Sequence, residues 1–136
     1  MRQADWNRDR TALRAVRKAV FIAEQGVPEA LEWDEADADC QHALAEAGGS
    51  PIGTGRLLPD GHIGRLAVVA AWRGHGVGTA LLELMLAMAR RHGHRHIELN
   101  AQTQALAFYA RFGFRPQGAD FDDAGIAHRR MTLDLD

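Results

Sequence analysis

The stretch from residue 76 to residue 92 restricts the folds open to this chain more than any other segment. Its leucines and methionines recur at helical spacing, with Leu81, Leu84 and Met88 on one face and further apolar side chains almost all round. Such a helix has to be covered on most sides, and a β-sheet offers a broad apolar face that can cover it. The sequence therefore predicts a helix that packs against a sheet and ends at Gly93.

The rest of the chain has the pattern of short strands separated by turns. Asp60-Gly61 and Ala124-Gly125 are typical of tight turns, and Asp-Gly supplies the positive φ that a hairpin requires. The order is helix, antiparallel strands, helix, strand, helix and strands. This order indicates a single-domain α/β fold with a mixed, mostly antiparallel sheet flanked by helices. The expected strands are 42–47, 52–58, 62–69, 96–101, 115–121 and 128–135, and the further helices are 7–23, capped by Asn7, and 103–112.

Length and composition suit one domain over residues 1–136. The chain has 136 residues, 46% of them hydrophobic, and a chain of this length buries about two thirds of its unfolded surface. Glu83 interrupts the longest apolar run before it reaches the roughly 20 residues of a membrane helix, and the first ten residues lack the apolar core of an export signal. Together with a single cysteine, Cys40, these features predict a cytoplasmic protein without a membrane partner.

The charge distribution argues against nucleic acid as a partner. Sixteen basic and eighteen acidic residues give a net charge of −2, which leaves no general positive field for phosphates. Residues 29–39 contain several acids and no base. A solvated surface is one interpretation of this acidic stretch, and attraction of a cationic substrate is the other.

A glycine-rich turn directly precedes the apolar helix. Residues 73–78 are Arg-Gly-His-Gly-Val-Gly, and the alternating glycines allow a ligand to approach the backbone closely. The helix N-terminus behind them offers unpaired N–H groups and a partial positive charge, which together indicate a phosphate or pyrophosphate site. A nucleoside-triphosphate loop is excluded, because the only lysine is Lys18. A dinucleotide fingerprint is weakly supported, because Gly74 and Gly76 lack a third glycine at the G-x-G-x-x-G spacing and residues 90–96 contain no acid.

Several separated blocks resemble the GNAT N-acetyltransferases, and in particular their ElaA-like branch. The blocks are Leu66-Ala67-Val68 with Arg73-x-x-Gly76-x-Gly78, residues 102–114 (QTQALAFYARFGF), 20–28 (VFIAEQGVP), 31–37 (LEWDEAD) and 124–131 (AGIAHRRM). The resemblance covers nearly the whole chain and implies the GNAT fold. The sequence departs from the family pattern at Gln102, where asparagine is commoner, and at the short N-terminus, which leaves little chain for the first strand.

The resemblance implies acetyl-CoA as the co-substrate. Backbone groups of residues 66–68 would pair with the pantetheine arm and polarise the thioester carbonyl, and amides of residues 75–79 would hold the pyrophosphate. The residues implied in acetyl-CoA binding are Leu66, Ala67, Val68, Arg73, Gly74, His75, Gly76, Val77, Gly78, Thr79 and Gln102. No metal site is expected, because His92-x-His94-x-His96 straddles the Gly93 turn and is typical of a solvated loop.

Tyr109 and Glu24 are the candidate catalytic residues. The resemblance places Tyr109 where many members have the acid that protonates the departing sulfur; the alternative is that it only packs beside Phe108 and Phe112. Glu24 lies near the C-terminal end of the first helix, where the helix dipole disfavours a carboxylate. It is therefore either the base for the amine proton or an ordinary exposed glutamate. Gln25, Glu32, Asp34 and His128 are candidates for acceptor binding, or residues of solvated loops.

The sequence as a whole predicts an acetyl-CoA-dependent N-acetyltransferase. The acetyl group would move to an amine by direct attack in a ternary complex, because no residue is distinguished as a covalent carrier. The acceptor would be a small molecule or a peptide, and the protein a monomer or a homodimer. The alternatives are a non-catalytic CoA-binding module and a protein-interaction domain that uses the acidic stretch.

Overall fold

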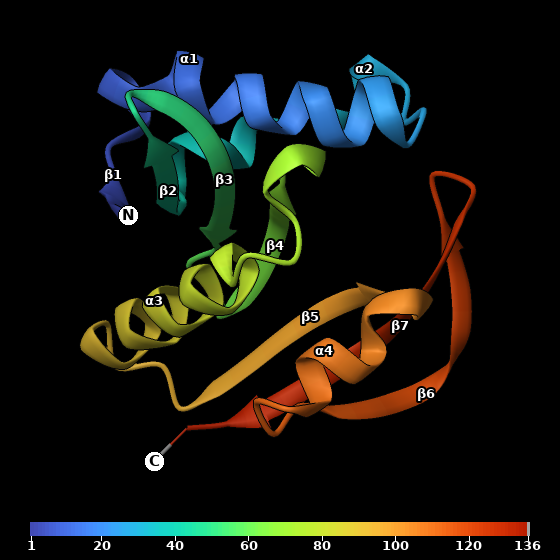
Figure 1. Ribbon diagram of the computed structural model, residues 1–136. Coiled ribbons are helices and arrows are strands. Elements are labelled where there is room, and N and C mark those ends of the chain that lie inside the picture. The colour runs from blue at the N-terminus through green and yellow to red at the C-terminus, as the bar shows by residue number, and fades with distance from the viewer. Residues whose placement is uncertain (136) are drawn as a thin grey trace.

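The computed structural model describes residues 1–135 (Figure 1). This part of the chain forms a seven-stranded sheet with the order β1-β2-β3-β4-β5-β7-β6. Its neighbouring strands are antiparallel except for β4 and β5, which are parallel. The expected mixed, mostly antiparallel sheet is therefore confirmed. The strands are β1 (Arg2–Ala4), β2 (Gln41–Ala47), β3 (Ser50–Leu57), β4 (His62–Val68), β5 (His96–Gln102), β6 (Arg115–Asp123) and β7 (Ile126–Asp134).

The helices are α1 (Trp6–Arg17), α2 (Glu29–Glu32), α3 (Val77–Arg91) and α4 (Leu106–Ala110). Helix α1 continues directly into a π-helical segment, Lys18–Glu24, so the helix expected over 7–23 contains two kinds of turn. Its N-terminal cap is Asp5, whose carboxylate accepts a hydrogen bond from the Asn7 N–H at 3.1 Å. The prediction that Asn7 caps this helix is therefore wrong. Short 3₁₀ turns lie at Glu35–Asp39, Ala70–Trp72 and Thr103–Ala105.

The apolar helix expected over 76–92 is α3, and it packs against the sheet. Leu81, Met85 and Met88 are fully buried. Two glycines of β3 make this contact close: a Cβ atom at Gly53 would lie 2.7 Å from Leu81 Cδ1, and one at Gly55 would overlap Met85. A side chain at either position would force α3 away from the sheet, which accounts for glycine in the middle of a strand.

Helices cover both faces of the sheet. Val16 and Val20, on α1 and the π-helical segment, pack with Ala67 of β4 in a cluster that is separate from the α3 core. Helix α4 belongs to the α3 side, where Phe108 lies close to Gly78 (Figure 1). Among residues 1–135, no helix is both long and apolar enough to cross a membrane.

The short N-terminus does form the first strand of the sheet. β1 pairs antiparallel with β2, with Arg2 opposite Leu44. Both terminal nitrogens of the Arg2 guanidinium donate to the Asp9 carboxylate at 2.8 Å, which ties β1 to α1. These bonds hold the pKa of Asp9 well below its usual range. The ion pair between Arg2 and Asp9 thus helps to hold in place a strand of only three residues.

Strands β4 and β5 diverge soon after they begin. The structure pairs them at two positions, the second of which joins Ile63 to Leu99. Two residues further along β4, Arg65 has a φ of 53°, a left-handed conformation that is uncommon for arginine, and the register of β4 against β3 shifts there. A bulge of this kind bends a strand, and here it accompanies the opening of the sheet between β4 and β5.

Candidate active site

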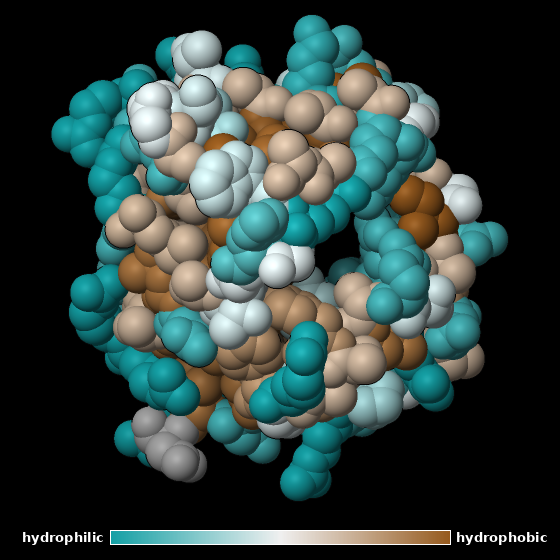
Figure 2. Space-filling model, in the orientation of Figure 1, coloured by the Kyte–Doolittle hydropathy of each residue, from teal (hydrophilic) through white to brown (hydrophobic). Residues whose placement is uncertain are grey.

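A cleft of about 500 Å³ opens where β4 and β5 diverge. Phe21 and Gln25 line it from the α1 side of the sheet, and Tyr109 of α4 lines it from the other side, so the cleft connects the two faces. Figure 2 shows a hollow in the surface beside the hairpin of β6 and β7. In Figure 1 the turn of this hairpin is separated from α1 and α2. Further polar and charged residues in its lining are Glu32, Arg56, Asp60, His62, Arg65, Asn100, Gln102, Asp123 and His128.

The glycine turn has the geometry of an anion site. Gly74 and Gly76 have φ values of 78° and 80°, which favour glycine, and Gly76 caps α3 without any side-chain hydrogen bond. The first bond across this cap runs from the Ala80 N–H to the Gly76 carbonyl at 3.1 Å, so the amides of residues 77–79 precede the bonded part of the helix. A Cβ atom at Gly74 or Gly76 would meet no protein atom within 4 Å. This open, uncapped N-terminus suits a phosphate group.

The residues expected to bind acetyl-CoA fall into two groups. Leu66 and Gln102 line the cleft, whereas none of the described residues 73–79 belongs to its lining. Ala67 is buried beside α1, and the Val68 carbonyl accepts a hydrogen bond from Arg73 Nε at 3.0 Å. The glycine turn is thus joined to the end of β4 but is a separate part of the site.

Glu24 is held by Arg73. Its carboxylate accepts hydrogen bonds from both terminal nitrogens of the Arg73 guanidinium, and this partner lowers the pKa of Glu24. The side chains are 40% and 43% exposed, and neither residue lines the cleft. The pair joins the end of the π-helical segment to the start of the glycine turn, and it leaves Glu24 a weaker base than a free glutamate.

Tyr109 packs among aromatic rings and also lines the cleft. Its ring makes edge-to-face contacts with Phe108 at 5.1 Å and with Phe114 at 5.9 Å between ring centroids, and the residue also lines the cleft. Burial raises the pKa of Tyr109 to about 12. A phenol with this pKa stays protonated at neutral pH, so it is equipped to donate a proton and not to accept one.

Gln25 and Gln102 both line the cleft and are joined by a hydrogen bond. Gln102 Nε2 donates to Gln25 Oε1 at 2.8 Å, which connects the end of β5 to the residue that follows the π-helical segment. Gln104 Nε2 donates to Gln102 Oε1 at 2.5 Å. The glutamine at position 102 therefore has a definite structural partner where the family more often has asparagine.

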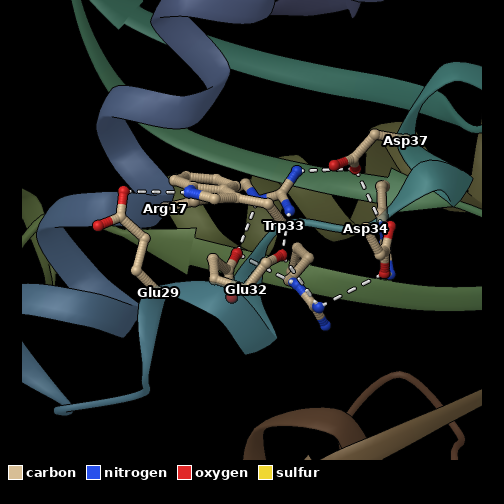
Figure 3. Close-up of polar contacts among 8 residues, drawn as sticks. Arg17, Glu29, Glu32, Trp33, Asp34 and Asp37 are labelled. Atoms are coloured by element: carbon tan, nitrogen blue, oxygen red, sulfur yellow. Dashed lines mark hydrogen bonds and ion pairs between the residues drawn. The ribbon is translucent and has the colours of Figure 1, made fainter.

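Buried ion pairs hold the acidic stretch in place (Figure 3). Arg17 is 1% exposed, and it donates to Glu32 Oε1 from Nε at 2.7 Å and to Asp37 Oδ1 at 2.8 Å. The Trp33 ring lies beside this guanidinium, at 5.2 Å from its centroid. The bonds fix α2 and the following turn against α1.

Two more arginines complete this cluster from the sheet. Arg56 of β3 donates to Asp34 at 2.8 and 3.0 Å and lowers the pKa of that carboxyl. Arg65 of β4 lies 3.2 Å from Glu32 Oε1. Glu32 and Asp34, expected to bind the acceptor, are thus neutralised within the protein, whereas Glu29, Glu35 and Asp39 of the same stretch are exposed.

Sequence reasoning missed these three arginines. Arg17 carried a signal, because it lies four residues after Leu13 on the apolar stripe of α1, where a charge has to find a buried partner. Arg56 and Arg65 carried no such signal. Each lies in a strand, and its acidic partners come from a segment that is distant in the sequence.

His128 has one ring nitrogen bound and lies at the cleft. It is 9% exposed, its Nδ1 lies 2.7 Å from the Ile126 carbonyl oxygen, and its ring stacks on Phe121 at 6.0 Å. Two further residues expected to bind the acceptor, Gln25 and Glu32, line the same cleft.

Two of the three histidines of residues 92–96 contact other protein groups. His96 lies 2.8 Å from Asp134 and 3.2 Å from Glu98, and His92 contacts Gln41. Within residues 1–135, no group of three or more histidine, cysteine or acidic side chains could hold a metal ion.

Sequence relatives extend over most of the chain. Residues 8–135 match the sequence profile of the acetyltransferase (GNAT) domain family. The uncharacterized N-acetyltransferase YjcF of Bacillus subtilis is 37% identical over 123 residues, 88% of each chain. Protein ElaA of Escherichia coli is 30% identical over 132 residues, 91% of this chain and 86% of ElaA.

Solved structures agree with this sequence match. The crystal structure of Escherichia coli ElaA superimposes with a TM-score of 0.85 at 29% identity, covering 93% of this chain and 90% of ElaA. That of an acyl-CoA N-acyltransferase from Pseudomonas aeruginosa gives 0.84 at 32% identity, with the same coverage of 93% and 90%. The chain therefore belongs to the GNAT acetyltransferase family, in its ElaA-like branch, and is an acyltransferase.

Proposed function

We propose that the protein transfers an acetyl group from acetyl-CoA to an amine in a ternary complex. The observation that carries this proposal is the divergence of β4 and β5, which opens a passage between the two faces of the sheet beside the uncapped end of α3. A donor bound at the glycine turn would place its acyl end in this passage. An acceptor would reach it from the side of Phe21 and Gln25.

The chemistry needs one bond to form and one to break. The amine nitrogen attacks the thioester carbonyl carbon, a C–N bond forms and the C–S bond breaks. Tyr109, protonated at neutral pH, gives its proton to the departing sulfur. The amine nitrogen loses a proton in the same step, and backbone N–H groups of β4 beyond Ile63 provide polarisation of the carbonyl.

The acceptor is proposed to be an amine of a small molecule or a peptide. Glu32, the acidic residue of this stretch that lines the cleft, gives no preference for a cationic acceptor, because Arg17 and Arg65 neutralise it. The acceptor would instead be selected by apolar and neutral polar contacts with residues such as Phe21, Leu31 and Asn100, which line the cleft.

Thiol release tests this proposal. The purified protein with acetyl-CoA and a panel of primary amines should release free CoA only when an accepted amine is present, with one acetylated amine per thiol. A calorimetric titration with CoA alone identifies the alternatives. Binding without turnover would indicate a CoA-binding module, and no binding would indicate an interaction domain.

A further inference from the structure

Acetyl transfer to an amine leaves one proton without a defined destination. The attacking nitrogen becomes positively charged as its C–N bond forms, and it has to lose a proton before the amide is complete. Tyr109 cannot take this proton, because it enters the reaction protonated and donates to sulfur. A separate base at the acceptor side of the cleft is therefore needed, and this need rests on the function proposed above.

The carboxylates near the cleft are poorly suited to this role. Glu24 is bound by Arg73 and lies outside the lining. Glu32 is 2% exposed and pairs with Arg17 and Arg65. Each of these carboxylates is already neutralised by a guanidinium, which makes it a weaker proton acceptor.

Two further carboxylates, Asp60 and Asp123, line the cleft. Asp60 lies in the turn before β4, 3.0 Å from His62, and this histidine holds the pKa of Asp60 below its usual value. Asp123 is exposed at the end of β6, where water solvates its carboxylate. An imidazole is also the stronger base, since histidine has a usual pKa of roughly 6.5 against roughly 4 for aspartate.

The hydrogen bond of His128 defines which of its nitrogens is free. A carbonyl oxygen accepts hydrogen bonds and never donates, so the 2.7 Å contact with the Ile126 carbonyl requires the proton to be on Nδ1. In the neutral ring, Nε2 then carries the lone pair. The structure gives Nε2 no partner among the described residues, so the basic nitrogen is unused by the fold.

The position of His128 is fixed by its strand and by the adjacent turn. It pairs in register with Gln102, the last residue of β5, which also lines the cleft. The turn before it has two residues with positive φ, Ala124 at 52° and Gly125 at 78°, the geometry of a tight two-residue hairpin. Such a turn holds the Ile126 carbonyl, and Phe121 stacks on the ring from the partner strand. Imidazole orientation is thus set before any ligand binds.

We propose that His128 is the base that accepts the proton of the attacking amine. As the C–N bond forms, the N–H bond of the acceptor breaks and a bond forms between this proton and Nε2. The resulting imidazolium keeps its Nδ1 hydrogen bond to the Ile126 carbonyl, and it returns the proton to water after the product leaves. Tyr109 and His128 line the same cleft, so one residue gives a proton to sulfur and the other takes one from nitrogen.

The pH dependence of two variants tests this role. His128→Asn can still donate to the Ile126 carbonyl but has no basic nitrogen, and His128→Gln provides a second substitution. The acceptor for this test is the least basic amine of the panel that the protein acetylates, and kcat/KM is calculated for the uncharged amine alone. In the wild type, the logarithm of this kcat/KM should fall on the acid side of the pH profile with a slope of one. Both variants should lose about 10²-fold in rate and lose this acid-side fall.

The controls distinguish a base from a structural residue. His96→Asn, at an exposed histidine of β5 outside the cleft, should keep both the rate and the fall. Both His128 variants should bind acetyl-CoA like the wild type in calorimetry. A variant that keeps the acid-side fall, with or without a loss of rate, would overturn the proposal.

A measurement independent of activity tests the same geometry. The ¹⁵N chemical shifts of the His128 ring should show the neutral form protonated on Nδ1, and the form protonated on Nε2 would overturn the proposal. If the wild type releases no thiol with any amine, acetyl transfer itself is wrong. The ring measurement then still shows whether the assignment of the free nitrogen is correct.

Discussion

At the scale of single residues, side chains that line the cleft are also held by structural partners. Tyr109 packs against Phe108 and Phe114 while it lines the cleft, and Gln102 joins β5 to Gln25. These contacts reduce the number of rotamers that each side chain can adopt. A side chain held in this way reaches its reactive position at a small cost in entropy.

Replacing Tyr109 with phenylalanine separates packing from proton donation. Tyr109→Phe keeps the edge-to-face contacts and removes the hydroxyl, so kcat should fall between severalfold and about 10²-fold while acetyl-CoA affinity and Tm stay the same. With its pKa at about 12, the hydroxyl should cause no alkaline loss of rate below about pH 11. Steady-state kinetics and a thermal melt measure these effects. Full activity of the variant would show that water protonates the sulfur.

Glu24 and Arg73 give a second prediction at this scale. Glu24→Gln should change kcat by less than about threefold, because the pair is exposed and outside the cleft. It should tighten acetyl-CoA binding at low ionic strength, since Arg73 is then free to approach a phosphate, and added salt should remove the gain. Kinetics at two salt concentrations measure both effects. A fall of about 10²-fold in kcat with loss of the acid-side limb would make Glu24 the base after all.

At the scale of elements, the N-terminus of α3 is the part of the site that sequence predicts best. Alternating glycines before an apolar helix indicate both an uncapped helix end and an open approach to it, and the structure has both. The π-helical segment after α1 has no comparable signal, because its residues also suit an ordinary helix. The cap at Asp5 was missed for a similar reason, since Asn7 is an equally good capping residue two positions later.

Two glycines at opposite ends of α3 form a matched pair for testing this helix end. Gly76 and Gly93 both have a φ of 80°, and a Cβ atom at either would meet no protein atom within 4 Å. Gly76→Ala and Gly93→Ala should therefore each cost roughly 1–2 kcal/mol of stability. Only Gly76→Ala should weaken acetyl-CoA binding, by about tenfold or about 1.4 kcal/mol. Calorimetry and thermal melts measure these effects, and equal affinities would remove the turn from the donor site.

The buried ion pairs of α1 and α2 give a prediction about stability. Arg17→Leu leaves Glu32 and Asp37 buried with one partner fewer each, and should destabilise the fold by about 3–5 kcal/mol. The exposed Arg14 on the same helix also lies over Trp33, at 5.2 Å, and Arg14→Leu should cost less than about 1 kcal/mol. Urea unfolding compares the two. Similar losses would mean that stacking on Trp33, and not the ion pairs, holds α2.

At the scale of the whole molecule, the divergence of β4 and β5 divides the sheet into two parts. One part contains β1–β4, and the other contains β5, β7 and β6, with direct pairing between them at two positions. Local sequence patterns predicted β2 to β7 but not β1, and the opening is accompanied by a bulge at Arg65, which no pattern of apolar residues reveals. The acceptor side was equally hidden, because the partners of its acidic residues lie on distant strands.

A donor that bridges this opening should stabilise both parts together. At a concentration of 100 times its Kd, acetyl-CoA should add about 2.7 kcal/mol to the free energy of unfolding. For a domain of this size that corresponds to a rise of roughly 10 °C in Tm.

Hydrogen exchange shows where that stabilisation acts. In the free protein, amides of β4 beyond Ile63 lack partners on β5 and should exchange faster than those of β3, which is paired on both sides. Acetyl-CoA should slow exchange at residues 64–68 and at 77–79, because pantetheine would pair with the first segment and the pyrophosphate with the second. At the same acetyl-CoA concentration, Gly76→Ala should show about tenfold less protection at both segments than the wild type, whereas Gly93→Ala should match the wild type. A rise in Tm without protection at residues 64–68 would show that the donor binds outside the opening, and the route of the acyl group through the sheet would then be wrong.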